Sequence, residues 1–358
     1  QYKKEYLPAL KEGKEYLKDT DKFVYENACR NVDDAYNRFF KGLSGFPKYA
    51  SRTKPNGSSF TTNFTNNNIE LKMIGGIPHV KLPKIGNIRF ILPKGKTLTD
   101  IQPHGVSIKA ATVSKESDGS YRISLRMESV IDKPVFPTFI NSSEIVSVDL
   151  GLKDFGVFGN LKETNTVPNP RWIQVHARRL RRFQKSLSRK QYDKKTHTGS
   201  RNWEKARLKV AKEQRKTADQ RRDFHHKLSR AITDNCVAFI CEDLAVKNMM
   251  KNRHLSKSIA SVGWYQFLKM VQYKMECAGK YFRKISRWYP SSQTCGCCGY
   301  KNTDVKDLSV RKWKCPKCGT WHDRDVNAQQ NIYKIGAKLF QDEGIQVIGL
   351  PATNKSAN

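Results

Sequence analysis

The sequence has no hydrophobic run long enough to cross a bilayer, and it is poor in acidic residues for its length. A membrane-spanning helix needs about 20 apolar residues, whereas the longest apolar runs, such as residues 236–241, are the size of a strand. Only 33 Asp and Glu stand against 66 Lys and Arg, which gives a formal net charge of +33. We therefore expect a soluble protein with a polyanionic partner. Nucleic acid is the first candidate, and an acidic membrane surface is a weaker one that we set aside.

Several common functional patterns are also missing. The sequence has no GxGxxG pattern, no Ser-His-Asp arrangement and no internal repeat, so nothing in it indicates a dinucleotide site, a serine hydrolase or a solenoid. Five of the nine cysteines lie within residues 295–318, which favours a metal site in a reducing, cytoplasmic setting over a disulfide framework. The chain begins with Gln1 rather than Met, so we expect the natural N-terminus to lie upstream.

The pattern of apolar and polar residues changes twice along the chain, which predicts a multidomain α+β protein. Near the start, apolar residues recur close to a 3.6-residue period, as in amphipathic helices. Short alternating runs separated by Gly and Pro follow, as in antiparallel hairpins. The predicted regions are a helical segment at 1–47, a small β-barrel or sandwich at 48–140, and a domain of strands and helices at 141–358, with a basic helical insertion at 171–230 and a metal ribbon at 290–320. We expect the tail at 351–358 to be disordered.

Positive charge is concentrated in residues 171–230, which hold 21 Lys and Arg against five Asp and Glu. Apolar residues on helical faces predict two basic helices joined by the polar stretch 191–200. A basic face this dense favours contact with nucleic acid over a merely solvated surface. The candidate contacts are Arg178, Arg179, Arg182, Lys205, Arg207, Arg221 and Arg222. Tyr192, Trp203 and Phe224 are candidates for base stacking, but helix packing is the preferred interpretation of Trp203 and Phe224.

Two CxxC pairs indicate a structural zinc site. Cys295 and Cys298 precede Cys315 and Cys318, and 16 residues separate the inner two, a spacing typical of a zinc ribbon. Each pair can present two thiolates from one tight turn, so that four sulfur atoms close a tetrahedral shell without an open position. Metal binding would then supply folding energy rather than catalysis. A pair of disulfides is the alternative, and Cys297 is interpreted as a spare thiol.

Three acidic residues stand out by their local context. Asp149 and Glu242 each close a hydrophobic strand, and Asp325 opens a helix. They are separated by 93 and 83 residues, so only folding can bring them together. Converging carboxylates suit two Mg²⁺ ions about 3.5–4 Å apart, which hydrolyse phosphodiester bonds. Taken singly, each is more often a helix cap, a turn residue or a surface acid.

At these residues the sequence resembles TnpB, the OrfB-type protein of bacterial insertion sequences and a compact relative of type V CRISPR effectors. The segments that carry the resemblance are VDLGLKDF at 148–155, EDLAVKNM at 242–249, PSSQTC at 290–295 with the paired cysteines, HDRDVNA at 322–328, DFHHKLS at 223–229 and, more weakly, NVDDAYNRFFKG at 31–42. The first, second and fourth of these are similar to the three RuvC motifs. Clear similarity covers about residues 144–335.

The resemblance implies a RuvC-like nuclease domain of RNase H fold, a β-barrel wedge domain and a helical recognition lobe. It implies an RNA-guided DNA endonuclease that uses a guide RNA derived from the transposon end and cuts double-stranded target DNA beside a short transposon-adjacent motif. In that role Asp149, Glu242 and Asp325 would hold two Mg²⁺ ions, and the four cysteines one Zn²⁺. Asp323 is the alternative to Asp325. We further expect a monomer with RNA, associated with the nucleoid of a bacterium or archaeon.

Two other functions stay open. A nuclease-inactive, RNA-guided DNA-binding regulator would keep the fold without assembling the carboxylates around metal, although all three acidic positions are intact. A DNA-joining transposase would rejoin ends through a 3′ hydroxyl, which nothing in the motifs demands. Gln329 and Gln330 stand where the family more often has small residues, and on a helix face we expect them to have little consequence.

Overall fold

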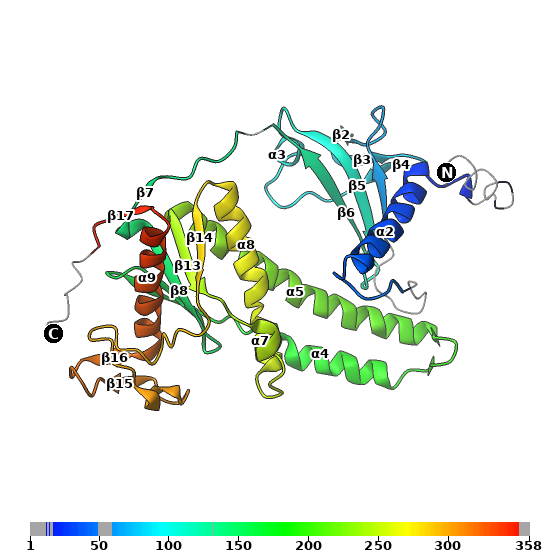
Figure 1. Ribbon diagram of the computed structural model, residues 1–358. Helices are drawn as coiled ribbons and strands as arrows, with labels where there is room; N and C mark the ends of the chain where they lie inside the picture. Colours follow the sequence, from blue (N-terminus) through cyan, green and yellow to red (C-terminus); the bar gives the residue numbers. More distant parts are fainter. Residues whose placement is uncertain (1–11, 13, 15–16, 49–58, 131, 351–358) are drawn as a thin grey trace. The chain divides into compact units, whose positions relative to one another are not determined.

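The computed structural model describes residues 12, 14, 17–48, 59–130 and 132–350. Its chain divides into two compact units, of which the first holds residues 1–132 and 183–212 and the second holds 133–182 and 213–358 (Figure 1). The tail predicted to be disordered lies outside the described residues. Among the helices of the described part, none combines the length and the apolar composition needed to cross a bilayer.

In the described part of residues 1–132, the first unit contains the long helix α2 (Lys22–Phe40) and two small antiparallel sheets. Helix α2 lies within the segment predicted to be helical, and the described residues that follow it in that segment are not helical. The sheets are β1–β5–β6 and β2–β3–β4, with strands at β1 Ser59–Asn63, β2 Glu70–Ile74, β3 Ile77–Leu82, β4 Gly86–Arg89, β5 Ser107–Lys115 and β6 Tyr121–Glu128, and the short helix α3 (Leu98–Ile101) between β4 and β5. Residues of both sheets share one core around Val80 and Ala111. Closure of the two sheets into a barrel stays a prediction.

A five-stranded sheet forms the centre of the second unit. Its order is β10–β9–β8–β13–β14, with strands at β8 Ile145–Leu150, β9 Asp154–Gly159, β10 Thr164–Pro168, β13 Ala238–Glu242 and β14 Tyr281–Ile285. Strands β8, β9 and β10 pair antiparallel, whereas β13 is parallel to both β8 and β14. The two strands predicted to be central, β8 and β13, are therefore neighbours. A separate parallel pair, β7 (Phe139–Asn141) and β17 (Gln346–Ile348), lies outside this sheet.

Helices cover both faces of this sheet, which explains why residues 238–241 of β13 are all apolar. On one face lies α9 (Arg324–Asp342), and on the other lie α7 (Ser256–Val262) and α8 (Trp264–Cys277) (Figure 1). Alternate residues of β13 serve the two faces, with Ile240 packing toward α9. A Cβ on Gly336 of α9 would stand 2.4 Å from the Ile240 side chain, so glycine is what allows the helix to approach the sheet this closely.

The basic insertion is a pair of helices, as the sequence predicts. Helix α4 spans Trp172–Ser188 and α5 spans Arg201–Asn235, joined by the two-residue strands β11 (Tyr192–Asp193) and β12 (Thr198–Gly199). The Tyr192 and Trp203 rings stack at 4.5 Å between centroids. Phe224 packs edge-on against Phe155 and Trp172. Phe224 thus packs against the core of the second unit, whereas Trp203 packs against Tyr192 in the connection between the two helices. The remaining elements are α6 (Val246–Met249) and the ribbon strands β15 (Lys312–Lys314) and β16 (Trp321–Asp323).

Candidate functional site

Two adjacent parallel strands bring Asp149 and Glu242 to one edge of the central sheet. Val148 pairs with Cys241, so the next position in that register sets Asp149 beside Glu242. Side chains alternate between the faces of a strand, and Ser147 and Ile240 both face α9. Asp149 and Glu242, each two residues further on, therefore point to the face that α9 covers.

Asp325 comes to this face in the first turn of α9, and Asp323 caps that helix. The Asp323 carboxylate accepts from the backbone N–H of Asp325 at 3.1 Å and of Val326 at 3.3 Å. A side-chain oxygen that satisfies the free N–H groups of a first helical turn is an N-cap. This geometry supports Asp325 over Asp323 as the third acidic residue. The Asp325 carboxylate instead accepts from Arg311, whose Nη1 lies 3.3 Å from each carboxylate oxygen.

The three carboxylates share one electrostatic environment. Burial raises the pKa of Asp149 well above its ordinary value, and the negative charges of Glu242 and Asp325 raise this pKa further. The positive charges of the nearby Arg324 and Arg311 guanidinium groups lower the Asp149 pKa and so partly offset this rise. Burial likewise raises the pKa of Glu242, which a hydrogen bond from a serine hydroxyl partly offsets. Mutually repelling carboxylates in a desolvated site favour a bound cation.

The oxygen donors of this site fit a hard divalent ion such as Mg²⁺, which binds carboxylates and water. In the described part of the chain, the carboxylates are not gathered as tightly as the cysteines, whose ligand atoms all lie within 4.8 Å of one another. The structure thus brings the three acidic residues together as electrostatic neighbours. Their role as metal ligands stays a prediction.

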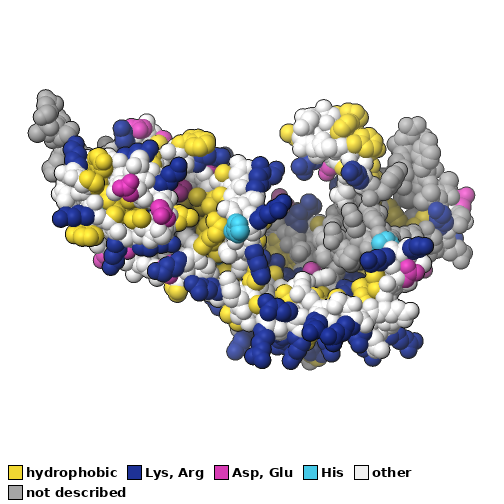
Figure 2. Space-filling view, turned by 90° about the horizontal axis from the view of Figure 1, so that it is seen from below, with side chains coloured by type: hydrophobic (Ala, Val, Ile, Leu, Met, Phe, Trp, Pro, Cys, Tyr) yellow, Lys and Arg dark blue, Asp and Glu magenta, His cyan; other side chains and the backbone are white. Residues whose placement is uncertain are grey.

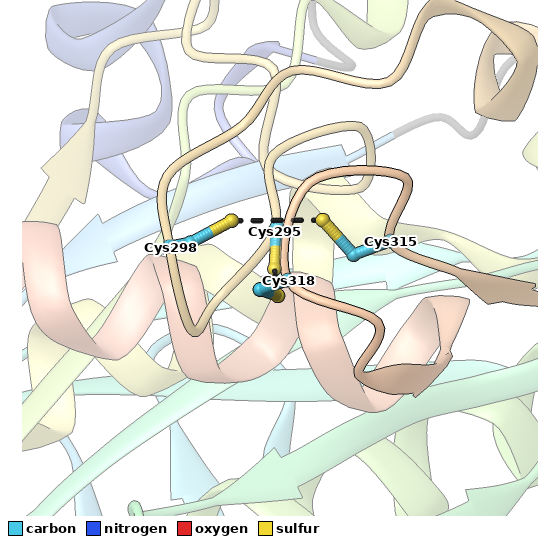
Figure 3. Close-up of side chains that lie close together, drawn as sticks. All are labelled: Cys295, Cys298, Cys315 and Cys318. Carbon is cyan, nitrogen blue, oxygen red and sulfur yellow. Dashed lines mark hydrogen bonds between the residues drawn. The ribbon is translucent and has the colours of Figure 1, made fainter.

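The four predicted cysteines converge in the ribbon (Figure 3). The Sγ atoms of Cys298 and Cys315 are 3.5 Å apart, and those of Cys295 and Cys318 are 3.6 Å apart. A Zn²⁺ ion with thiolates at about 2.3 Å places sulfur atoms about 3.8 Å apart, whereas a disulfide needs about 2 Å. The cluster can therefore hold zinc, and the disulfide alternative does not fit.

The local backbone of the ribbon shapes this sulfur cluster. Gly299 N donates to Cys295 O and Gly319 N donates to Cys315 O, each at 2.9 Å. Both glycines have φ near +70°, at 73° and 72°, a region that side-chain-bearing residues rarely adopt. The two CxxC turns thus close in the same way. Cys297 is exposed and outside the cluster, in line with its interpretation as a spare thiol.

The predicted nucleic-acid contacts differ in exposure and in their partners within the chain, and Arg222 is exposed but its Nη1 also lies 3.5 Å from Asp219 Oδ1. Arg178, Lys205 and Arg222 are exposed, and Figure 2 shows Lys and Arg side chains over much of the face seen from below, with few acidic side chains between them. Others make contacts within the chain. Arg207 binds Glu204 and the Ser117 carbonyl, Arg221 donates to the carbonyls of Ala260 and Ser261, and Arg179 lies 3.2 Å from Glu213. Arg182 is exposed. Nucleic-acid contact by all seven stays a prediction.

Two residues near the carboxylates have no role in the sequence analysis, and a third, Gln329, has a different one from that expected. Ser291 donates from Oγ to Glu242 Oε1 at 2.5 Å, and Arg311 pairs with Asp325. The only sequence signal for the Ser291 contact is the pair of adjacent serines just before the first CxxC turn. No sequence signal points to Arg311. The expectation for Gln329 is wrong. It is fully buried, and its Nε2 donates to Ser147 Oγ at 2.7 Å, because the helix face that carries it lies against the sheet.

Two family models match consecutive parts of the chain. The OrfB_IS605 model, described as "Probable transposase", matches residues 128–253. The model of the Cas12f1-like TNB domain matches residues 264–332, which include the ribbon and the start of α9. A "Putative RNA-guided DNA endonuclease" from Streptomyces pristinaespiralis is 32% identical over 323 residues, covering 90% of this chain and 73% of the relative. The chain belongs to the TnpB family.

Other comparisons agree with membership of the TnpB family. The "Putative RNA-guided DNA endonuclease InsQ" of Escherichia coli K12 is 27% identical over 338 residues, covering 90% of this chain and 76% of the relative. Among solved structures, Cas12f1 in the "Cas12f1-sgRNA-target DNA complex" matches with a TM-score of 0.53 at 15% identity, covering 83% of this chain and 67% of that one. At this identity, the likeness shows a shared fold.

Proposed function

We propose that this TnpB-family protein is an RNA-guided DNA endonuclease that cuts double-stranded target DNA beside a short transposon-adjacent motif. The observation that carries the proposal is that Asp149, Glu242 and Asp325 meet at one face of the central sheet. There the negative charges of Glu242 and Asp325 both raise the pKa of Asp149. The names of the two relatives support the same activity. A guide RNA would read the target by base pairing, while the protein holds phosphates and duplex shape.

The proposed catalytic domain has a RuvC-like RNase H fold. The sheet has the order β10–β9–β8–β13–β14. Its strands β8 and β13, the first and fourth along the chain, lie side by side, and each carries one of the acidic residues. The shared fold with Cas12f1 supports this assignment. The two small sheets of the first unit would form the wedge domain, and α2 would belong to the recognition lobe.

The three acidic residues would hold two Mg²⁺ ions. Bound there, the ions would supply activation of the attacking water and stabilisation of the leaving 3′ oxygen. The chain's own groups prepare the site: the sheet fixes the spacing of Asp149 and Glu242, the Asp323 cap fixes the first turn of α9, and the Ser291 hydroxyl orients Glu242. The zinc ribbon would be structural because its four thiolates leave no open position.

Exposed cations of α4 and α5 would neutralise phosphates of the guide and target. Five of the candidates are exposed, namely Arg178, Arg179, Arg182, Lys205 and Arg222. Each phosphate that a duplex-binding protein neutralises contributes about −0.9 to the slope of log affinity against log salt. We therefore expect target binding to weaken steeply between low and moderate salt. We also propose that the active species is one protein chain with one guide RNA.

A cleavage assay tests the proposed function. The RNA that co-purifies with the protein is sequenced, and linear DNA carrying its complement beside a randomised flank is incubated with the complex, with and without Mg²⁺. Cleavage that requires Mg²⁺, the matching target and one flanking motif is the expected result. Asp149→Asn should abolish it, whereas Asp243→Asn should not, because the Asp243 carboxylate pairs with Arg287 at the exposed edge.

Three outcomes would contradict the proposal. Undiminished cutting by Asp149→Asn would remove the carboxylate from catalysis. Guide-dependent binding without cleavage at any Mg²⁺ concentration would indicate a regulator, and products joined through a 3′ hydroxyl would indicate a transposase.

A further inference from the structure

The loop that leads into the zinc ribbon is fastened to α9 by two buried asparagines. We call residues 290–296 the ribbon-base loop. Asn327 donates from Nδ2 to Thr294 O at 2.8 Å and accepts at Oδ1 from Gly296 N at 2.9 Å. Asn331, one turn further along α9, donates to Thr294 O at 2.7 Å and to a second carbonyl of the loop at 2.8 Å. Both asparagines are at most 2% exposed, so loss of either would leave buried polar groups without partners.

The same loop reaches the carboxylate site through Ser291. Its Oγ donates to Glu242 Oε1 at 2.5 Å, and its backbone carbonyl is the second acceptor of Asn331. Ser291 is 7% exposed, and its hydroxyl has a single hydrogen to give. A hydrogen bond from a buried hydroxyl to a carboxylate is short and strong. The orientation of Glu242 is therefore set by a residue whose own backbone is held by α9.

The adjacent serine provides a natural contrast. Ser292 is half-buried, and within the described residues its hydroxyl makes no comparable hydrogen bond to a side chain. The contact with Glu242 thus depends on which of two consecutive serines faces the sheet. The loop includes Cys295, whose Sγ is part of the sulfur cluster. A single short segment therefore joins the zinc ribbon, helix α9 and strand β13.

We propose that Ser291 is a positioning residue for Glu242 and that the ribbon-base loop couples the folded zinc ribbon to the divalent-ion site. The proposal rests on the proposed function of the carboxylates. Residues that orient a metal ligand by hydrogen bonding change metal affinity by about 10–100-fold when they are lost. The Ser291 hydroxyl occupies such a position, and Asn327 and Asn331 hold it there.

The test measures divalent-ion affinity directly and also through cleavage. Mn²⁺ binding to the RNA-bound protein is titrated by electron paramagnetic resonance in the absence of target DNA, and cleavage is followed over a range of Mg²⁺ concentrations. Ser291→Ala should weaken Mn²⁺ binding about tenfold and raise the Mg²⁺ concentration for half-maximal cleavage by about the same factor. Saturating Mg²⁺ should restore most of the rate. Ser291→Thr, which keeps the hydroxyl, should restore wild-type affinity, and Ser292→Ala should match the wild type.

A second variant tests the coupling without touching the serine. Asn331→Ala should also weaken Mn²⁺ binding while one Zn²⁺ per chain remains, measured by elemental analysis. Wild-type Mn²⁺ affinity in both Ser291→Ala and Asn331→Ala would overturn the inference. So would a loss of cleavage in Ser291→Ala that saturating Mg²⁺ does not restore and that accompanies a lower melting temperature, because a merely structural serine predicts that pattern. If the wild type itself neither cleaves nor binds Mn²⁺, the proposed function fails instead.

Discussion

The ribbon and the carboxylate site are built in opposite ways, although both gather side chains suited to a metal. The ribbon takes its four sulfur atoms from two tight turns within residues 295–318, and these atoms lie within 4.8 Å of one another. The carboxylates come from two strands and a helix, and they meet only because a large core packs α9 against the sheet. Loss of one sulfur ligand should therefore unfold the ribbon alone. The geometry of the carboxylate site, in contrast, should change with substitutions throughout the core of the second unit.

The largest expected effect comes from removing a sulfur ligand. Cys315→Ser breaks the four-thiolate shell, and the small core of Val305 and Trp313 cannot compensate, because such metal sites supply about 10 kcal/mol or more of folding free energy. We expect zinc content to fall well below one per chain and the ribbon to become sensitive to protease. The main thermal transition of the sheet should remain. Cys297→Ser is the control, because Cys297 lies outside the cluster, and its free energy of unfolding should stay within about 0.5 kcal/mol of the wild-type value. An intact, protease-resistant ribbon in Cys315→Ser would contradict the claim that the ribbon depends on its own metal site.

The reverse disruption targets the carboxylates and spares the ribbon. Glu242→Gln keeps the shape of the side chain but removes a charge from the proposed metal site. We expect this substitution to remove about 4 kcal/mol of transition-state stabilisation, which lowers the cleavage rate about a thousandfold. Single-turnover cleavage measures the rate, and zinc content should not change. Asp243→Asn is the matched control, and a Glu242→Gln rate within tenfold of the control would contradict the assignment.

A pH-dependent effect should arise on the opposite face of the sheet, where His225 is fully buried. Burial lowers the pKa of His225 to about 4, although the hydrogen bond from its Nε2 to Val262 O acts to raise this pKa. Between pH 6.5 and 4 the unfolded chain binds a proton that the folded chain does not, so folding stability falls as the pH falls. The expected loss is about 3 kcal/mol. Denaturant titrations should show it as a steeper decline in the wild type than in His225→Gln; parallel declines would contradict the buried neutral histidine.

The smallest effect concerns the contact between α9 and β8. Gln329→Ala removes donors to Ser147 Oγ and to Gly159 O, so it should destabilise the second unit by about 2 kcal/mol. The half-buried neighbour offers the control, since Gln330→Ala should change the free energy of unfolding by less than about 0.5 kcal/mol. Denaturant midpoints measure both. Equal effects of the two substitutions would mean that the buried amide network does not fix α9 on the sheet.

The sequence predicts those features that depend on local pattern. The hydrophobic runs ending at Asp149 and Glu242 indicate buried strands, and the cysteine spacing indicates the ribbon. Local pattern indicates the individual strands β1 and β5 only weakly, because Ser59–Asn63 and Ser107–Lys115 mix polar and apolar residues without a clean alternation. The contacts of Ser291 and Gln329 are equally hidden, since each depends on a partner 49 or 182 residues away. Local pattern does not specify which helix face meets the sheet.

The most direct test of the central claim counts the divalent ions in the carboxylate site. Mn²⁺ bound to the RNA–protein complex is measured by electron paramagnetic resonance for the wild type, Asp149→Asn and Asp243→Asn. The account predicts two bound ions in the wild type and in Asp243→Asn, and the loss of at least one in Asp149→Asn. Two ions bound with unchanged affinity in Asp149→Asn would contradict the claim that these acidic residues form one metal site.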